Sequence, residues 1–565
     1  MSALLAWAWV FPLVGLALTA LGVGGRRPGI ASLIGPLLIL VAAILWLLNP
    51  VEQNVVFLNW LPFLPDGSFH LRADSLAAVM LAVVGFVSLM VYAYSLSYMD
   101  GDPGQRRFFC YLDFFVAAMT VLVLAGTLGV LLIGWAGVGL ASFLLISFWR
   151  DRAGTMSSGL QALAANMIGD AALLLAAVIV PWGCGDLTTL DTADCSSGLG
   201  GPTLLAALLL IAASAKSAQG PLYFWIPTAM AGPTPVSALI HAATMVAAGV
   251  YLLTRTHAVL DLAPGVLAVT AWLGTLTMLG GGIGSLFQRN FKRGLAYSTI
   301  SQLGYMFAAV GLASPFAAFF HLFTHAFFKA LLFLAAGVAI HATDGEENLD
   351  RLGGLRKALP WSFAAFSIGS LALIGLPFTS GAFSKDAIIE SALEHNLLIG
   401  LLLLGGALLT GLYTGRLLFG VYFGPERTHP HHSEPRLLTW PLVPLIVGAL
   451  LAGYVEWPGG GLSALLSSVF GEIEPLHGLS LVGLGAGGLG VVGMALAWVL
   501  AKRGEETKLD AQPAALDLGW AASVGGWGYD LAARVATMQS GQLTRYALAS
   551  LLGVAVILFV AARLG

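Results

Sequence analysis

The chain has 565 residues, of which 58% are hydrophobic and only 10% are charged, whereas a typical soluble domain carries roughly 25% charged residues. This composition excludes a water-soluble globular enzyme, a disordered chain and a disulfide-rich secreted scaffold. The net charge of -3 provides no basic surface that could neutralise phosphates, so the composition also argues against nucleic-acid binding.

Along the chain, the apolar residues form separate stretches close to the roughly 20 residues that a helix needs to cross a bilayer. They predict an all-α polytopic membrane protein with about 16 transmembrane helices, whose natural partner is the lipid bilayer. Their approximate ranges are 3–23, 30–48, 74–99, 108–127, 128–149, 158–181, 202–224, 234–254, 264–286, 295–313, 316–340, 361–391, 397–423, 439–454, 480–501 and 543–563.

Lys and Arg are distributed unevenly between alternate loops, and this predicts the orientation because cytoplasmic loops are enriched in these cations. One set of loops contains nineteen cations and the other only three, Arg72, Arg255 and Arg563. We therefore expect a multi-pass protein of a prokaryotic cell membrane, the inner membrane, with both termini outside. The nineteen are Arg26, Arg27, Arg106, Arg107, Arg150, Arg152, Arg289, Lys292, Arg293, Arg351, Arg356, Lys357, Arg427, Arg436, Lys502, Arg503, Lys508, Arg534 and Arg545.

Two loops contain residue types that bind metals or form cross-links. Cys184 and Cys195 lie in a predicted outward loop without Lys or Arg, where a disulfide and two unpaired thiols are both open alternatives. His429, His431 and His432 lie in a predicted cytoplasmic loop. A solvated loop explains them better than a metal site, since no cysteine or ordered set of carboxylates accompanies them.

Ionisable residues within the apolar stretches are the candidates for function, because a charge near the bilayer centre costs roughly 2.5 to 3.5 kcal/mol. His321, His325 and Lys329 are spaced four apart, which places them on one helix face as a polar stripe about 12 Å long. The stripe indicates a proton path, and the alternative is three side chains satisfied separately by neighbouring helices. The other candidates are Lys216, His241, Asp113, Asp170 and the pair Lys385 and Asp386.

Two stretches contain residues that interrupt a helix at its middle. Gly220 and Pro221 follow Lys216, and Pro377 precedes Lys385. Proline removes a backbone donor and glycine loosens the turn, which exposes backbone groups that only a polar cavity satisfies. Interrupted helices in corresponding halves are typical of transporters with inverted repeats. We expect two inverted five-helix repeats, each containing a broken helix, which divide the chain into 1–107, 108–260, 261–425 and 426–565.

Several long segments match a known family, among them Lys-Ser-Ala-Gln at 216–219, Trp-Ile-Pro-Thr-Ala-Met at 225–230, and residues 232–251, 296–306 and 321–333. They closely resemble the antiporter-like subunits, of the subunit L type, of proton-pumping NADH:quinone oxidoreductase (respiratory complex I), within the Mrp-type antiporter superfamily. The resemblance covers roughly residues 74–425, with weaker likeness towards both ends.

The resemblance implies a proton-translocating subunit that has no redox centre, quinone site or cofactor of its own and that contacts other membrane-arm subunits. Lys216 would be the central lysine of the input half. The stripe of His321, His325 and Lys329 would carry the proton sideways, with His241 on the same axis. Lys385, beside Asp386, would open to the outer side.

The chain departs from the family pattern mainly in its amino-terminal half. Ala136 stands where the family has the glutamate that pairs with the lysine at the position of Lys216. We expect Asp170 or Asp113 to supply the missing carboxylate, since an unpaired buried ammonium tends to deprotonate. The alternative is that this half is inactive. Gln161, Met167, Thr228 and Asn290 also replace charged residues of the family.

The carboxy-terminal part and the choice of complex leave further alternatives. Residues 504–542 contain Pro513 and clustered glycines, so we expect the family's long lateral helix to be shortened or absent. The rival functions are a subunit of an Mrp-type sodium/proton antiporter, a membrane-bound hydrogenase or an inorganic-carbon uptake complex, and a scaffold that conducts nothing. The buried lysines argue against the scaffold, because unused buried charges are costly.

Overall fold

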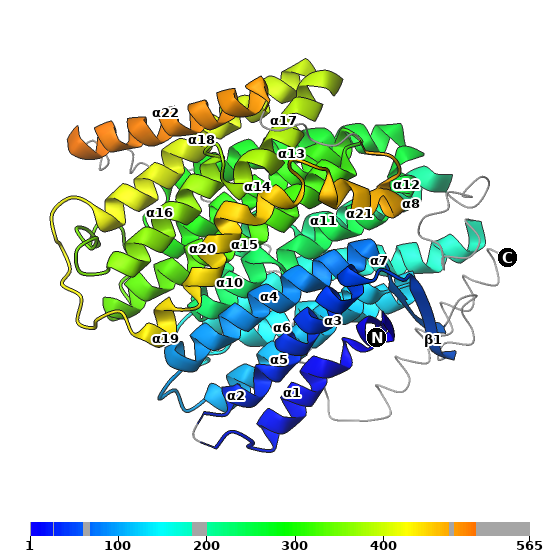
Figure 1. The fold of residues 1–565 in the computed structure, drawn as a ribbon, viewed down its shortest axis with the longest axis horizontal. Coiled ribbons are helices and arrows are strands. Elements are labelled where there is room, and N and C mark those ends of the chain that lie inside the picture. The colour runs from blue at the N-terminus through cyan, green and yellow to red at the C-terminus, as the bar shows by residue number, and fades with distance from the viewer. Residues whose placement is uncertain (1, 26, 60–67, 184–200, 474–479, 504–565) are drawn as a thin grey trace. The chain divides into compact units, whose positions relative to one another are not determined.

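A computed structural model describes residues 2–25, 27–59, 68–183, 201–473 and 480–503, and Figure 1 shows the arrangement of their helices. Cys184, Cys195, the segment 504–542 and the last apolar stretch, 543–563, lie outside the described residues. Expectations about the disulfide and the lateral helix therefore stay predictions.

The described part is predominantly helical, and helical residues coincide with every predicted stretch from 3–23 to 480–501. Eleven of its helical segments are long and apolar enough to cross a membrane by length and composition. The chain is thus a multi-pass membrane protein. The amino-terminal half contains η1 (Ser2–Trp7), α1 (Val10–Ala20), α2 (Gly29–Ser32), α3 (Ile34–Leu48), α4 (Ser75–Tyr98), α5 (Gln105–Leu124), α6 (Leu128–Ile146), α7 (Thr155–Gly183), α8 (Gly201–Lys216), η2 (Leu222–Phe224), α9 (Trp225–Thr228), η3 (Ala229–Ala231), α10 (Thr234–Ala242), α11 (Met245–Arg255) and α12 (His257–Asp261).

The second half repeats this pattern of long apolar helices joined by short connections. It contains α13 (Pro264–Phe287), α14 (Phe291–Gly311), α15 (Pro315–Ala342), α16 (Pro360–Ile374), α17 (Ser380–His395), α18 (Leu397–Tyr422), α19 (Arg436–Thr439), α20 (Leu442–Leu451), η4 (Ala452–Val455), α21 (Gly461–Phe470) and α22 (Leu481–Arg503). Proline begins α13, α15 and α16, where its missing N–H has no intrahelical partner to lose. Asn290 and Asn396 cap α14 and α18 through their side-chain oxygens.

Residues 53–59 and 68–73 form the two antiparallel strands of a hairpin, so the expectation of an all-α chain was wrong for these residues. Strand β1 (Gln53–Asn59) pairs with β2 (Ser68–Ala73), with Val55 opposite Leu71. The run of Val55, Val56 and Phe57 has the β-branched and aromatic character that favours strands. The hairpin leads directly into α4 and contacts the start of α6.

A buried ionic cluster joins the end of the hairpin to α4 and α11. Both Arg255 and Asp74 are almost completely buried. The Arg255 guanidinium donates two hydrogen bonds to the Asp74 carboxylate and a third, of 2.8 Å, to Tyr251 Oη. Arg72 Nε lies 3.1 Å from the same carboxylate, and Asp74 also caps α4 by accepting from Ala77 N–H at 2.9 Å.

The central helix of the described structure is α15, which contacts α4, α10, α11, α14, α16, α17 and α20. In Figure 1 the helices α1–α6 lie on one side of α10 and α15, while α13, α14, α17, α18 and α22 lie on the other. The segment of α10 and α11 is wholly buried, and α15 is nearly so. Because these two segments carry four of the predicted site residues, the site lies in the protein interior and away from lipid.

Candidate functional site

The predicted stripe on α15 is buried, and neutral polar side chains from neighbouring helices contact it. His321 Nδ1 lies 2.9 Å from Ser384 Oγ of α17, and its Nε2 lies 3.2 Å from Gln302 Oε1 of α14. The rings of His321 and His325 are 6.3 Å apart between centroids. Hydrogen-bonded side chains and close imidazoles are the elements from which a proton relay is built.

Lys329 lies one turn beyond His325 and is also fully buried. Its Nζ donates a 2.8 Å hydrogen bond to Ser298 Oγ of α14. In the described structure no carboxylate lies within ion-pair distance of this ammonium group. Ser298 and Gln302 are spaced four apart on α14, so they form a polar row facing the stripe. Sequence reasoning missed this row, although its spacing was visible in the segment 296–306.

The second broken helix places Lys385 beside a free backbone carbonyl. Helix α16 ends at Ile374 and α17 begins at Ser380, so the last carbonyl groups of α16 lack intrahelical partners. Lys385 Nζ donates a 2.9 Å hydrogen bond to the carbonyl oxygen of Leu373 in that last turn. The predicted break near Pro377 therefore creates the acceptor for the buried lysine.

Asp386, next in sequence to Lys385, is bound to a different partner. It accepts hydrogen bonds from the backbone N–H and the hydroxyl of Ser480, at 2.8 and 2.6 Å. Ser480 immediately precedes α22, so this carboxylate caps that helix. These hydrogen bonds hold α22 against α17. Lys385 and Asp386, although neighbours in sequence, therefore bind different partners.

In the amino-terminal half, Lys216 is the last residue of α8 and is fully buried. Its Nζ lies 3.7 Å from Asp170 Oδ1 of α7 and 5.4 Å from the centre of the Trp135 ring of α6. A Cβ at Gly139 would lie 3.0 Å from this Nζ, so glycine leaves room for the ammonium group. Asp170 is thus the carboxylate that the structure brings to Lys216.

Asp113 lies in α5, apart from this set. Its Oδ2 accepts a 2.6 Å hydrogen bond from Ser32 Oγ, which lies 2.8 Å from Thr19 Oγ1. The carboxylate also packs against Gly15 of α1. Within the residues that the structure describes, no contact joins Asp113 to Lys216.

His241 lies in the last turn of α10, where it meets α15 of the second half. It is fully buried, and its ring stacks on Phe333 of α15, with centroids 4.9 Å apart. Neither ring nitrogen has a hydrogen-bond partner in the described structure. The helix is interrupted directly after His241, between Ala242 and Met245, although neither Gly nor Pro stands at this interruption. Ser217 of the first break donates a 2.7 Å hydrogen bond to Val246 O just beyond it.

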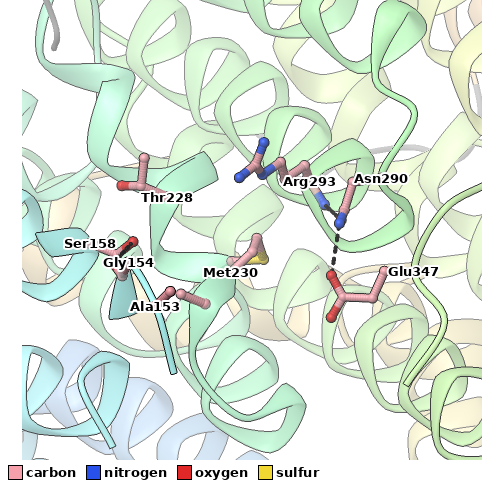
Figure 2. A pocket seen from close by; sticks show the side chains of 9 residues that line it. Ala153, Gly154, Ser158, Thr228, Met230, Asn290, Arg293 and Glu347 are labelled. Atoms are coloured by element: carbon pink, nitrogen blue, oxygen red, sulfur yellow. Dashed lines mark hydrogen bonds between the residues drawn. The ribbon is translucent and has the colours of Figure 1, made fainter. Parts of the chain in front are cut away.

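A cavity of about 220 Å³ lies beside loops that contain cations, with Gly154, Asn290 and Glu347 among its lining residues. We call this end of the helices the cation-rich face, formed by the loops 147–154, 288–290, 343–359 and 423–435. Figure 2 shows Thr228 and Met230 between Ser158 on one side and the hydrogen-bonded pair of Asn290 and Glu347 on the other. Lys292 Nζ, next to this cavity, lies 2.6 Å from Glu347 Oε1. Two of the departures from the family pattern, Thr228 and Asn290, therefore line one cavity.

Comparisons with known proteins identify the family of the chain. The family described as "NADH:quinone oxidoreductase/Mrp antiporter, TM" matches residues 125–410, and "NADH-Ubiquinone oxidoreductase (complex I), chain 5 N-terminus" matches residues 60–109. NADH-quinone oxidoreductase subunit L of Escherichia coli K12 is 38% identical over 93% of this chain and 88% of its own length. The chain belongs to the NADH:quinone oxidoreductase/Mrp antiporter family.

Other members of this antiporter family are also similar over long segments. NADH-ubiquinone oxidoreductase chain 5 of Cryptococcus neoformans is 42% identical over 70% of this chain, and subunit L of Mycobacterium tuberculosis is 43% identical over 72%. The matched segment spans 62% and 66% of these two relatives. The solved structure of the Mrp complex from Dietzia sp. superposes with a TM-score of 0.82 at 27% identity, covering 99% of this chain and 63% of that one.

Within the antiporter family, this chain carries Ala136 where a glutamate is expected, which makes Asp170 the candidate counter-ion of Lys216. We expect Asp170→Asn to reduce proton translocation by about tenfold, because the buried ammonium loses its partner and deprotonates. The measurement is the proton-pumping rate of the native complex in proteoliposomes.

Asp113→Asn is the matched control for Asp170→Asn, since it neutralises a buried carboxylate on another helix that does not contact Lys216. This control is expected to pump at the wild-type rate. Equal pumping by Asp170→Asn and Asp113→Asn would remove Asp170 from the path.

Proposed function

We propose that this chain is the proton-translocating, antiporter-like membrane subunit of a proton-pumping NADH:quinone oxidoreductase. Redox chemistry in other subunits would drive it, and the chain would supply the path through the membrane. The observation that carries the proposal is the buried row of Lys216, His241, Lys329, His321 and Lys385. Their partners come from α7, α14, α16 and α17.

The path that we propose has an entry in the amino-terminal half and an exit in the carboxy-terminal half. Lys216 with Asp170 receives the proton. His241, Lys329, His325 and His321 pass it sideways through the protein interior, and Lys385 releases it on the opposite side. Asp386 positions α22 beside this exit, and Asp113 holds α2 against α5 through its bond to Ser32.

We also propose that two inverted five-helix repeats underlie this path, over residues 108–260 and 261–425. The breaks after Lys216 and before Lys385 support this pairing, because each interrupts a helix next to a buried lysine. The segments 1–107 and 426–565 would flank the repeats. The loop cations support cytoplasmic placement of the cation-rich face in the inner membrane.

A second candidate is a subunit of an Mrp-type sodium/proton antiporter, which the similarity to the Dietzia Mrp complex favours. The buried lysines and histidines would serve either assembly. Purifying the native complex through a tag on this chain and identifying its other polypeptides separates the two. Quinone-oxidoreductase subunits support our proposal, and a set of antiporter subunits without them supports the second candidate.

The function is tested by Lys385→Met in the native complex, which removes the exit amine while keeping a similar side-chain volume. We expect fewer protons to be translocated per NADH oxidised. Lys502→Met is the matched control, because Lys502 is exposed at the end of α22. An unchanged ratio in Lys385→Met would favour a scaffold that conducts nothing.

A further inference from the structure

We propose that the imidazoles and the carboxylate at the end of α15 form a proton-collecting site on the cation-rich face. From it, Tyr98, Thr234 and Ser237 lead to His241. The site takes protons from water and delivers them to His241, so the inference rests on the proposed function and adds to it a second entrance, which matters most where free protons are scarce.

The collecting site consists of His341, Asp344, His431 and His432. Nε2 of His432 lies 3.4 Å from Asp344 Oδ1, and Nε2 of His431 lies 3.7 Å from Asp344 Oδ2. The ring of His432 stacks at 6.1 Å on that of His341, the last histidine of α15. Both loop histidines are more than half exposed. They therefore meet water, and both rings lie beside the Asp344 carboxylate.

The loop 423–435 is attached to the end of α15, which fixes the collecting site in place. His431 N–H donates a 2.8 Å hydrogen bond to the carbonyl oxygen of Ala342, the last residue of α15. Thr428 Oγ1 donates to Arg351 O at 2.7 Å. In the described structure Asp344 forms its ion pairs with these two histidines, and no Lys or Arg forms one with it.

Tyr98 of α4 connects the surface to the interior. Its ring contacts that of His341, with centroids 5.8 Å apart, and it stacks at the same distance on Tyr94. Tyr98 Oη lies 3.2 Å from Thr234 Oγ1. Tyr98 is half-buried and Thr234 is fully buried. This hydroxyl pair is the point at which the polar contacts pass from the surface into the protein.

Helix α10 continues the line from Thr234 towards the centre. Thr234, Ser237 and His241 are spaced three and four residues apart, so they lie on one face of α10. Ser237 Oγ and both His241 nitrogens are buried polar atoms without a hydrogen-bond partner in the described structure. Such atoms are rare in proteins and indicate positions where internal water binds. His241 also interacts electrostatically with Lys329, so the line ends at the buried row.

In the proposed transfer, a neutral imidazole of His431 or His432 accepts a proton from hydronium or a buffer acid in the medium, which leaves as water or the conjugate base. The imidazole becomes an imidazolium beside Asp344. His341 receives the proton next, and water between the imidazole and Tyr98 carries it onward. Each hydroxyl, of Tyr98, then Thr234 and then Ser237, accepts a proton from behind and donates its own forward, so none retains a charge. The proton reaches His241, and every residue behind it returns to its starting state.

The test compares the double variant His431→Gln/His432→Gln with His429→Gln in the native complex in proteoliposomes. His429 lies in the same loop, is 84% exposed and pairs with Glu426 instead. NADH is added outside, so that the active complexes have the cation-rich face in the outer medium. In dilute buffer at about pH 8.5, where free protons are scarce, we expect the double variant to pump about tenfold more slowly than His429→Gln.

Two further readouts separate proton collection from a structural role. At about pH 6 the deficit in the pumping rate of the double variant should disappear. At alkaline pH an excess of mobile imidazole buffer should restore the wild-type rate. Equal rates for the double variant and His429→Gln in dilute alkaline buffer would overturn the proposal. A deficit that neither acid nor imidazole relieves would also overturn it.

Tyr98→Phe tests the connection to α10, because it keeps the stacked ring and removes the hydroxyl that meets Thr234. We expect slower pumping that imidazole buffer does not restore, because the lost step, from Tyr98 to Thr234, lies inside the protein and not at its surface. Tyr111→Phe is the control on α5. Wild-type pumping in Tyr98→Phe would refute the route through Thr234. A wild-type complex that moves no protons would refute the proposed function itself, which distinguishes the two failures.

Discussion

Lys329→Met is expected to lower proton translocation through this subunit by about a hundredfold. Lys329 is the midpoint of the buried row, and its ammonium group bonds to the neutral Ser298 hydroxyl. Methionine has a similar volume and removes a buried charge, so the protein should fold and assemble normally. The measurement is the number of protons moved per NADH oxidised, with assembly checked by the recovery of the purified complex.

Lys357→Met is the matched control for Lys329→Met, since Lys357 is exposed in the loop before α16. It is expected to translocate protons at the wild-type ratio. Lys329→Arg adds a second comparison, because arginine keeps the charge but does not release its proton at physiological pH. It should therefore also be inactive. Normal pumping by the arginine variant would show that Lys329 supplies only a positive charge.

Arg255→Met is expected to cause the largest loss of stability among single substitutions in the described part, about 3–5 kcal/mol. It leaves the buried Asp74 carboxylate without its bidentate partner. Arg72, whose side chain is 15% exposed and whose Nε lies 3.1 Å from the carboxylate, does not replace the two lost hydrogen bonds. The measurement is the half-life of the detergent-purified complex during heating, since a chain in a multi-subunit complex does not unfold in two states.

Two comparisons make the Arg255 prediction specific. Arg289→Met removes an exposed ion pair with Asp350, of 3.8 Å, and should cost less than about 1 kcal/mol. The double variant Asp74→Asn/Arg255→Met should recover part of the loss, because no buried carboxylate is left without its guanidinium partner and asparagine still caps α4. A double variant no more stable than Arg255→Met alone would contradict this account.

The helices and the breaks next to Lys216 and Lys385 were predictable because they depend on local properties. Long apolar stretches, helix-starting prolines and the Gly-Pro and Pro interruptions act over a few residues. The break between α10 and α11 was not predictable in this way. It depends on tertiary contacts, above all the hydrogen bond from Ser217 to Val246 O. The β1–β2 hairpin was not predicted, because strands of seven and six residues are much shorter than the apolar stretches that indicate a membrane helix.

The candidate residues were predictable as a set, but their pairings were not. Lys385 and Asp386 are neighbours in sequence, and consecutive helical residues do not face each other. Their partners, Leu373 O and Ser480, come from segments whose positions only the fold determines. The sequence likewise left Asp170 and Asp113 as equal choices for Lys216, and the packing of α7 against α8 selects Asp170.

The groups around the row on α15 and α17 are uncharged: two serines, a glutamine amide and a backbone carbonyl. A lysine or histidine of the row that holds no extra proton is therefore neutral, and one that holds it carries a full positive charge. At this depth such a charge strongly repels a second cation. We therefore expect two neighbouring side chains of the row not to be protonated together, so each incoming proton displaces the one ahead of it. In the described structure Lys216 differs from these side chains, because the Asp170 carboxylate lies 3.7 Å from its Nζ. We therefore expect protons to leave the side chains of α15 and α17 one at a time, each driven by the arrival of the next.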